Sequence, residues 1–210
     1  TDGWWKGFNR IYNSLCYDYL YENPSSVLAF IENHDTDRFL GNGKDATALK
    51  QALALLLTIN RIPQLYYGTE VLLNGTKEVT DGNVRRDFPG GFPGDTHDCF
   101  TSTGRNTAEN GMYEWLSRVL HWRKGNAIIT QGSQKQFIPY QGVYVICRQL
   151  NGKTVMTVLN GRRSAAELNV RRYAEVIGNH TSARDITTGT TIDLTRNVPL
   201  SERQTMILEF

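Results

Sequence analysis

Hydrophobic and polar residues follow two different periods along the chain, and the first half carries the helical one. Apolar residues recur every three or four positions over residues 7–22 and again after Asp45, a typical N-cap residue, which predicts two amphipathic helices. A short apolar run follows each helix, at residues 27–31 and 63–67, with the length of a buried strand. Because helix and strand alternate with short connections, the first half is predicted to be an α/β fold with parallel strands.

A stretch without hydrophobic periodicity extends from Gly68 to about Asn106. Loops of this length are uncommon unless they are functional, and this one is rich in glycine, proline and charged residues. Asn106 and Glu109 have the spacing of a capping pair, so they predict the start of a further helix, which Gly125 ends. A long functional loop is therefore expected between the second strand and this helix.

From residue 126 onward the hydrophobic period is two. Short alternating segments are separated by turn signals at Gln141-Gly142, Asn151-Gly152 and Asn160-Gly161, a pattern typical of an antiparallel β-sandwich. The change of period divides the chain into an α/β part, residues 1–125, and an all-β part, residues 126–210. Four polar residues of the second part are interpreted as solvated positions on strands and turns: Arg148, Asn160, Arg162 and Arg163.

Composition and charge narrow the class of partner. The chain of 210 residues is 40% hydrophobic and 21% charged, which is typical of a globular protein. Its formal net charge is +2 and its acidic and basic residues are interspersed, so nothing favours nucleic acid or a membrane surface as partner. No apolar run approaches the ~20 residues needed to cross a bilayer, so no membrane insertion is expected. A neutral ligand fits this composition better.

The cysteines give no sign of a disulfide framework or a metal site. There are three of them, Cys16, Cys99 and Cys147, and they lack the CxxC or Cys/His spacing of a zinc site. Cys16 and Cys147 lie on apolar faces and are interpreted as free thiols. We therefore predict no metal ligands in this sequence.

Polar side chains gather directly after the first predicted strand. Six of them follow one another: Asn33, His34, Asp35, Thr36, Asp37 and Arg38. In barrel enzymes the catalytic residues lie at the ends of strands. This abrupt change from apolar to polar residues therefore indicates a functional site.

Three segments resemble motifs of one enzyme family. FIENHD, residues 30–35, resembles the third-carboxylate motif of the alpha-amylase family of glycoside hydrolases. RIPQLYYGTE, residues 61–70, resembles that family's last barrel strand, and TDGNVRRDF, residues 80–88, resembles its sugar-subsite loop. The order and spacing of the motifs agree with the neopullulanase and cyclomaltodextrinase branch. The resemblance implies an α/β plus all-β protein, the C-terminal part of a TIM (β/α)8 barrel in residues 1–125 followed by an antiparallel β-sandwich in residues 126–210.

The resemblance also implies roles for individual residues. Asp35 matches the carboxylate that stabilises the oxocarbenium-like transition state, although an aspartate at this place could also cap a helix. His34 would donate to a sugar hydroxyl or hold Asp35 in place, or it caps the local backbone. Asp81 and Arg85 match the pair that holds a sugar on the non-reducing side of the cut, while an ordinary surface ion pair would have the same spacing.

Aromatic and basic residues near these motifs are further candidates for sugar contact. Tyr67 lies at a strand end beside another tyrosine, and one of the two is expected to line the pocket while the other packs in the core. Arg86 is assigned either a sugar contact or a salt bridge within its loop. Trp4 and Trp5 could stack on sugar rings, but core packing is the preferred interpretation.

The size of the α/β part limits the chemistry. A complete barrel takes about 250 residues, and only about 125 precede the sandwich. In the family, the nucleophile Asp and the acid/base Glu lie upstream of the matched segment, and their motifs do not occur here. Retaining hydrolysis needs both carboxylates, roughly 5 Å apart. The chain is therefore expected to be the C-terminal part of a retaining glycoside hydrolase and to be inactive alone.

The whole enzyme is expected to act on α-1,4-linked glucans such as starch, maltooligosaccharides, pullulan or cyclodextrins. The competing interpretation is a non-catalytic module that binds glucan or a protein partner. No cofactor is expected in this segment, and calcium use by the whole enzyme cannot be derived from it. The family resemblance favours a periplasmic or extracellular location over the cytoplasm. A partial barrel also leaves open strand edges and apolar faces, so self-association through its open side is expected.

Overall fold

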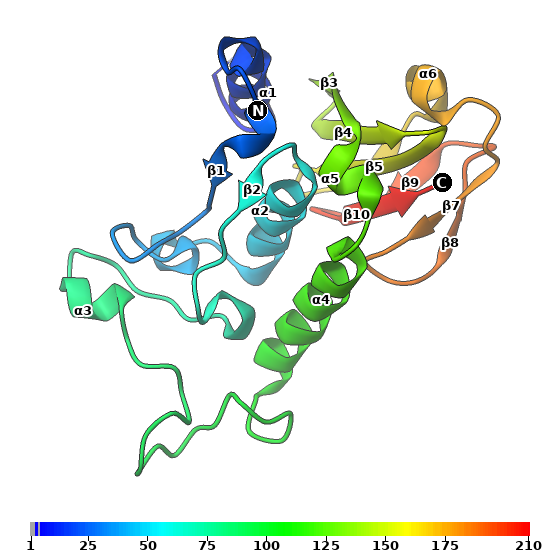
Figure 1. Ribbon diagram of the computed structural model, residues 1–210. Coiled ribbons are helices and arrows are strands. Elements are labelled where there is room, and N and C mark those ends of the chain that lie inside the picture. The colour runs from blue at the N-terminus through cyan, green and yellow to red at the C-terminus, as the bar shows by residue number, and fades with distance from the viewer. Residues whose placement is uncertain (1–2, 4) are drawn as a thin grey trace.

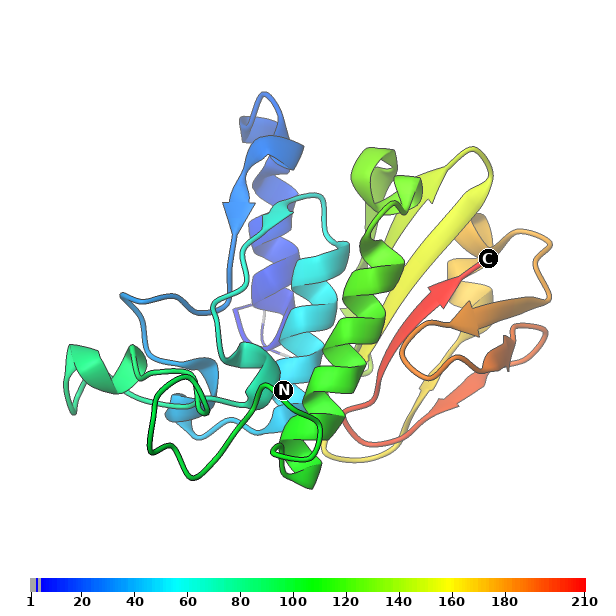
Figure 2. The ribbon, with the colours of Figure 1, turned by 60° about the horizontal axis from the view of Figure 1, so that its bottom comes forward.

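The computed structural model describes residues 3 and 5–210, so Trp4 lies outside the described residues. Three helices, α1 (Phe8–Leu15), α2 (Ala46–Thr58) and α4 (Thr107–Arg123), stand between a short pair of strands and a large antiparallel sheet (Figures 1 and 2). Shorter helical turns connect these elements: η1 (Cys16–Leu20), η2 (Pro24–Ser26), η3 (Phe39–Asn42), η4 (Thr69–Val71) and α3 (Asp81–Val84). None of the helices in the described part of the chain has the length and apolar character that crossing a bilayer requires.

Local capping signals set the helix starts that the sequence predicts. The Asp45 side chain accepts a hydrogen bond from the backbone N–H of Ala48 at 2.9 Å, and α2 begins at the next residue. At the start of α4, Asn106 and Glu109 form a capping box, each side chain accepting from the other's backbone N–H. Both predicted helix starts are confirmed.

The predicted strands of the first half are present but short. β1 (Leu28–Ala29) and β2 (Ile62–Pro63) pair in parallel, with Leu28 opposite Ile62. The expectation that the first strand is buried is wrong, because Leu28 is 53% exposed, and Ile62 opposite it is 49% exposed. The second strand was predicted at residues 63–67 and lies at Ile62–Pro63. Two strands cannot cover both of their own faces, and the described residues form no closed barrel around them.

The second half forms the predicted antiparallel sheet. Its six strands lie in the order β3 (Ser133–Tyr140), β4 (Val143–Leu150), β5 (Lys153–Asn160), β10 (Thr205–Glu209), β7 (Ser182–Asp185) and β8 (Thr191–Asp193). Gln141-Gly142 and Asn151-Gly152 form two-residue turns in which all four residues have positive φ, between 50° and 79°, as a type I′ hairpin requires. The third predicted turn also lies between strands: β5 ends at Asn160, whose Oδ1 accepts a hydrogen bond from the Arg162 N–H at 3.0 Å. Asn160 is nevertheless buried, and its side-chain amide donates to the carbonyl oxygens of Ser164 and Ser201.

Each face of this sheet covers a separate core. One face packs against α2 and α4, so that Tyr144 and Ile146 of β4 share a core with Leu53 and Leu116. The other face packs against a two-stranded sheet, β6 (Ala166–Leu168) with β9 (Val198–Leu200), and against α6 (Ala174–Ile177). Since β4 and β5 are buried on both faces, apolar residues follow one another over residues 143–147 of β4, and those of β5 are interrupted by Thr157, which is buried too. The first core spans both predicted parts, and the division at residue 125 stays a prediction.

Two residues interpreted as solvated are buried instead. Arg148 is 2% exposed, and its guanidinium donates to the carbonyl oxygen of Gly132 and to Asn60 Oδ1. Burial lowers the pKa of Arg148 to about 10. Asn160 is fully buried, whereas Trp5, for which core packing was preferred, is exposed. Arg148 thus joins β4 to Gly132 and to Asn60, and Asn160 joins the end of β5 to Ser164 and Ser201, by satisfying buried polar groups.

Candidate functional site

The polar segment after β1 turns Asp35 outward. Asn33 Oδ1 accepts a hydrogen bond from the Asp35 backbone N–H at 2.8 Å, and Thr36 Oγ1 accepts from the Asn33 N–H at 3.0 Å. This Asx turn follows β1 after a few residues and leaves the Asp35 side chain 60% exposed. The Asp35 carboxylate therefore faces solvent and contacts the side chains of His34 and Arg85.

Arg85 brings three predicted site residues together. Its Nη2 lies 3.1 Å from Asp35 Oδ1 and 3.3 Å from Asp81 Oδ2, while its Nε donates to the His34 carbonyl oxygen at 3.0 Å. His34 Nε2 lies 3.1 Å from the other Asp35 oxygen, Oδ2. The single-turn helix α3, which Thr80 caps, places Asp81 and Arg85 four residues apart on one side. Four of the six predicted residues therefore form one connected group.

Lys77 completes this group and was missed at the level of sequence. Its Nζ lies 3.2 Å from Asp81 Oδ1 and 3.3 Å from the Asp35 carbonyl oxygen. The available signal was its position four residues before Asp81. We call Lys77 and the four residues His34, Asp35, Asp81 and Arg85 the Asp35 cluster. Its two carboxylates face two fixed cations, so its polar atoms are oriented before any ligand arrives.

Tyr67 and Arg86 lie together beside the Asp35 cluster. The Tyr67 hydroxyl donates to the Arg86 carbonyl oxygen at 2.7 Å, whereas the Arg86 guanidinium contacts Asn74 Oδ1 at 2.8 Å. Tyr67 is more exposed than Tyr66, and the two rings pack edge to face. Burial raises the pKa of Tyr66 above its ordinary value. Of the two tyrosines, Tyr67 therefore presents its ring toward solvent, and Arg86 has a loop partner in Asn74.

A buried ion pair, Arg38 with Glu32, lies beneath the surface on which the Asp35 cluster is exposed. Arg38 is 1% and Glu32 is 2% exposed, and Arg38 Nη1 lies 3.5 Å from Glu32 Oε1. Arg38 donates to the carbonyl oxygens of Tyr67 and Val84 at 2.6 and 3.0 Å, and its guanidinium carbon lies 3.9 Å from the centre of the Tyr66 ring. Glu32 accepts hydrogen bonds from the Phe39 N–H and from the Thr69 hydroxyl. The pair thus ties the Asp35 turn to both loops that carry the remaining site residues.

The geometry suits recognition of a polyhydroxylated ligand. An exposed carboxylate accepts hydrogen bonds from adjacent hydroxyls and stabilises positive charge at a sugar carbon, and arginine and lysine donate to hydroxyl oxygens. Both carboxylates of the Asp35 cluster contact the same Arg85 nitrogen, which holds them close together. The Asp35 cluster can bind and stabilise, and bond cleavage needs further groups.

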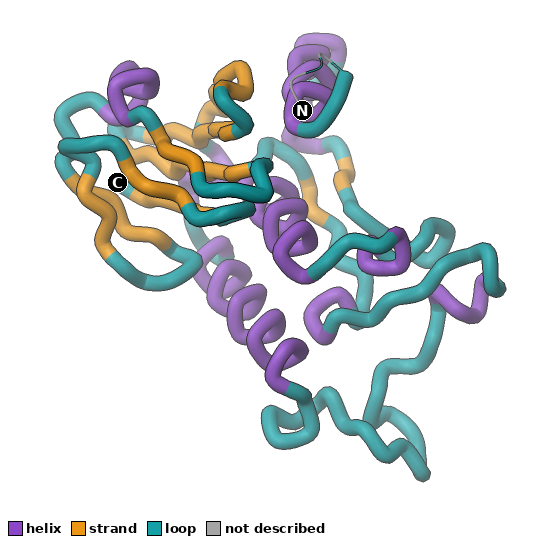
Figure 3. Tube along the Cα trace, turned by 180° about the vertical axis from the view of Figure 1, so that it is seen from behind, coloured by secondary structure: helices purple, strands orange, loops and turns teal. Residues whose placement is uncertain are grey.

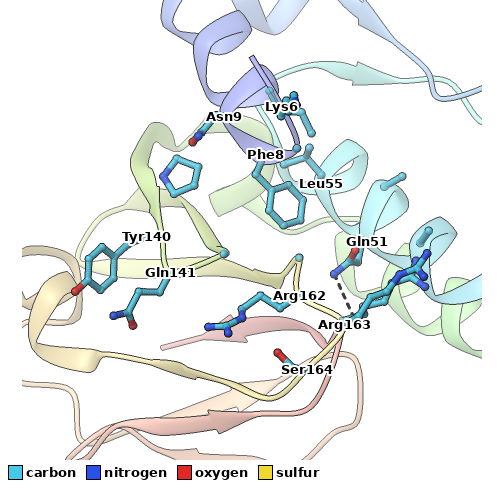
Figure 4. A pocket seen from close by; sticks show the side chains of 18 of the residues that line it. Lys6, Phe8, Asn9, Gln51, Leu55, Tyr140, Gln141, Arg162, Arg163 and Ser164 are labelled. Atoms are coloured by element: carbon cyan, nitrogen blue, oxygen red, sulfur yellow. Dashed lines mark hydrogen bonds between the residues drawn. The ribbon is translucent and has the colours of Figure 1, made fainter. Parts of the chain in front are cut away.

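A large cavity lies elsewhere, between α1, α2 and the turns of the sheet (Figure 4). Its volume is about 1170 Å³, and Phe8 from α1, Leu55 from α2 and Tyr140 from β3 face it. The described residues that line it include five cations, Lys6, Lys44, Arg162, Arg163 and Arg203, but no carboxylate. A cavity without carboxylates does not suit glycosidic chemistry, so the Asp35 cluster remains the candidate site.

Comparison with known proteins agrees with the motifs. Residues 134–209 match the family described as Cyclo-malto-dextrinase C-terminal domain. An alpha-amylase of Niallia circulans is 30% identical over 191 residues, 87% of this chain and 32% of that protein. A cyclomaltodextrin glucanotransferase of Geobacillus stearothermophilus is 30% identical over 166 residues, 79% of this chain and 20% of that protein. The chain thus spans about a fifth to a third of the length of these curated relatives.

The fold is also similar to that of solved structures. The alpha-amylase of Geobacillus thermoleovorans, complexed with acarbose, matches with a TM-score of 0.72 at 19% identity. The match covers 95% of this chain and 42% of that one. The likeness therefore extends over the helices and the sheet together.

Proposed function

This chain belongs to the alpha-amylase family of glycoside hydrolases and matches its C-terminal part, and from that premise we propose that it carries the transition-state-stabilising carboxylate of an enzyme acting on α-glucans. The observation that carries the proposal is Asp35, held at a strand end between His34 and Arg85. The named relatives are glucan-acting enzymes, and the similar structure was solved with acarbose. The reaction is retaining hydrolysis, or transfer, of α-1,4-linked glucans such as starch, maltooligosaccharides, pullulan or cyclodextrins, with the neopullulanase and cyclomaltodextrinase branch as the closest type.

In this proposal β1 and β2 are the last two strands of a (β/α)8 barrel. Their parallel pairing supports this, as does the position of α2 and α4 between them and the antiparallel sheet (Figure 2). The remaining strands of the barrel would bury the faces of Leu28 and Ile62. The antiparallel domain packs against the outer helices and supports them.

The roles within the site follow from its geometry. Asp35 stabilises the positive charge that develops at the anomeric carbon, and His34 orients Asp35 or donates to a hydroxyl. Asp81 and Arg85 hold the neighbouring sugar unit, Tyr67 offers an exposed ring beside them, and Arg86 supports the loop. The nucleophile and the acid/base carboxylate belong to other parts of the whole enzyme. The alternative, a glucan-binding module without chemistry, differs only in turnover.

We expect the 210-residue chain to bind maltoheptaose without cleaving it. Nuclear magnetic resonance titration should shift the amide signals of Asp35, Asp81 and Arg85, and Arg85→Ala should weaken binding about tenfold or more, because charge-assisted hydrogen bonds are lost. Arg184→Ala, an exposed arginine on β7 of the distant sheet, is the matched control and should bind as the unaltered chain does. Equal binding by the Arg85 variant would contradict the assignment of the sugar site, and cleavage products would contradict the missing carboxylates.

The exposed face of β1 and β2 should make the isolated chain self-associate. Leu28 and Ile62 lie side by side across the pair, and Phe30 is 43% exposed next to them. Sedimentation velocity should show a concentration-dependent dimer, and the double change Leu28→Glu with Ile62→Glu should give a monomer. Val79→Glu, which alters an apolar loop residue that is 67% exposed, serves as control. A compact monomer of the unaltered chain at high concentration would refute this expectation.

A further inference from the structure

The long loop between α3 and α4 projects away from the helices and sheets, as Figure 3 shows. Near its C-terminal end, where α4 begins, three side chains with different donor atoms meet: His97, Cys99 and Glu109. His97 Nε2 lies 3.0 Å from both carboxylate oxygens of Glu109 and 3.2 Å from Cys99 Sγ. A nitrogen, a sulfur and an oxygen ligand thus meet within one small volume.

The polar atoms of this group converge on one imidazole nitrogen. A neutral imidazole nitrogen carries at most one hydrogen, which can serve one acceptor well. Here a single nitrogen, His97 Nε2, faces two carboxylate oxygens and a sulfur at the same time. A cation placed among these atoms interacts favourably with all of them.

The two distances from His97 Nε2 are close to those that a tetrahedral ion requires, and all three ligand atoms lie within 4.8 Å of one another. Zinc bound at its usual lengths holds a nitrogen and an oxygen ligand about 3.4 Å apart and a nitrogen and a sulfur ligand about 3.6 Å apart. The observed separations of 3.0 and 3.2 Å differ from these values by only a few tenths of an ångström. A small outward movement of the exposed His97 side chain accommodates the ion.

Burial divides the three residues in a way that suits a metal site. Cys99 is 1% exposed, and the side chains of Glu109 and His97 are 15% and 43% exposed. The sulfur is therefore shielded, while the imidazole side is open to solvent for entry of the ion and for a water as fourth ligand. The backbone around Cys99 is fixed, since its N–H donates to the Pro89 carbonyl oxygen and its own carbonyl accepts from Arg105.

The donor set selects the class of ion. Calcium and magnesium take oxygen ligands, whereas thiolate and imidazole together favour zinc and similar transition ions. We propose that His97 Nε2, Cys99 Sγ and one Glu109 oxygen bind one Zn²⁺ ion. The ion attaches the long loop to the start of α4, a structural role that does not depend on the proposed action on glucans.

Zinc binding to the metal-free 210-residue chain tests this proposal. Isothermal titration, with metal analysis after gel filtration, should give one zinc per chain and a higher thermal unfolding temperature. Glu109→Gln is the decisive variant, because glutamine keeps the capping box of α4 while a weaker ligand replaces the carboxylate. This variant and His97→Gln should each bind zinc at least about tenfold more weakly. Cys16→Ser, which alters an exposed thiol outside the site, should bind as the unaltered chain does.

Cobalt(II) gives a readout for the sulfur ligand. The unaltered chain with cobalt should show a thiolate-to-metal absorption band in the near ultraviolet, and Cys99→Ser should lack it. If the Cys99 variant does not fold, the exposed His97 variant decides by its zinc affinity alone. No zinc on the unaltered chain after gel filtration, or full affinity in both the Glu109 and His97 variants, would overturn the proposal.

Discussion

Asp35→Asn in the whole enzyme is expected to lower the turnover of maltoheptaose by at least about 10²- to 10³-fold while the fold is retained. Asparagine has the size of aspartate and keeps a hydrogen-bonding oxygen toward Arg85, but it removes the negative charge that faces the developing oxocarbenium ion. Because this interaction strengthens in the transition state, kcat should fall much more than KM changes. Steady-state kinetics and thermal unfolding of the same preparations measure both effects.

The control for this change is Asp193→Asn, which makes the same substitution at an exposed carboxylate on β8, in the antiparallel domain. It should leave turnover unaltered. An Asp35 variant with full activity would refute the catalytic assignment. A whole protein that binds maltoheptaose but never cleaves it, before any substitution, would favour the binding-module alternative instead.

Local sequence signals account for the parts of the fold that could be predicted. Asp45 and the Asn106/Glu109 pair act within three residues of a helix start, so their effect is readable without knowing the rest of the structure. The same holds for the turn at Asn151-Gly152, where both residues have the positive φ that a tight hairpin needs. These features depend on backbone geometry over a few residues.

Features that depend on distant partners were missed. β9 pairs with β6, about 30 residues earlier, and the short helices α5 (Ala127–Gln131) and α6 lie in a region predicted to be entirely β. Asn160 was predicted as a turn residue, but its burial was missed because its side chain also donates to the carbonyl oxygen of Ser201, 41 residues further along the chain. Such positions are fixed by tertiary packing, which a local pattern does not contain.

Some residues of the candidate site could be predicted from the sequence, and others could not. The motif resemblance identified Asp35 and Arg85, and the structure brings them together across 50 residues of chain. The supporting pair of Glu32 and Arg38 was not identified, because a charged residue at a strand end looks like any solvated one in sequence. His97 also gave no signal, since its ligand partners follow no common metal-binding spacing and Glu109 already had a role as a helix cap.

Arg38→Met is expected to destabilise the chain by about 3 to 5 kcal/mol. Methionine matches the length of the arginine stem, but it leaves the Glu32 carboxylate buried without its cation and removes the donors to the carbonyl oxygens of Tyr67 and Val84. The loops that carry the site residues then lose their common support. Urea unfolding measures the loss, and Arg86→Met, whose guanidinium contacts Asn74 at the surface, should cost less than about 1 kcal/mol.

A double-mutant cycle separates the ion pair from the remaining bonds of Arg38. If the cost of Arg38→Met arises mainly from the unpaired carboxylate, then Glu32→Gln combined with Arg38→Met should be less destabilising than the sum of the two single changes, because the second change removes the buried charge. Additive effects would instead assign the stability to the carbonyl bonds and to the contact with Tyr66. A loss no larger than that of Arg86→Met would mean that the buried pair does not support the loops at all.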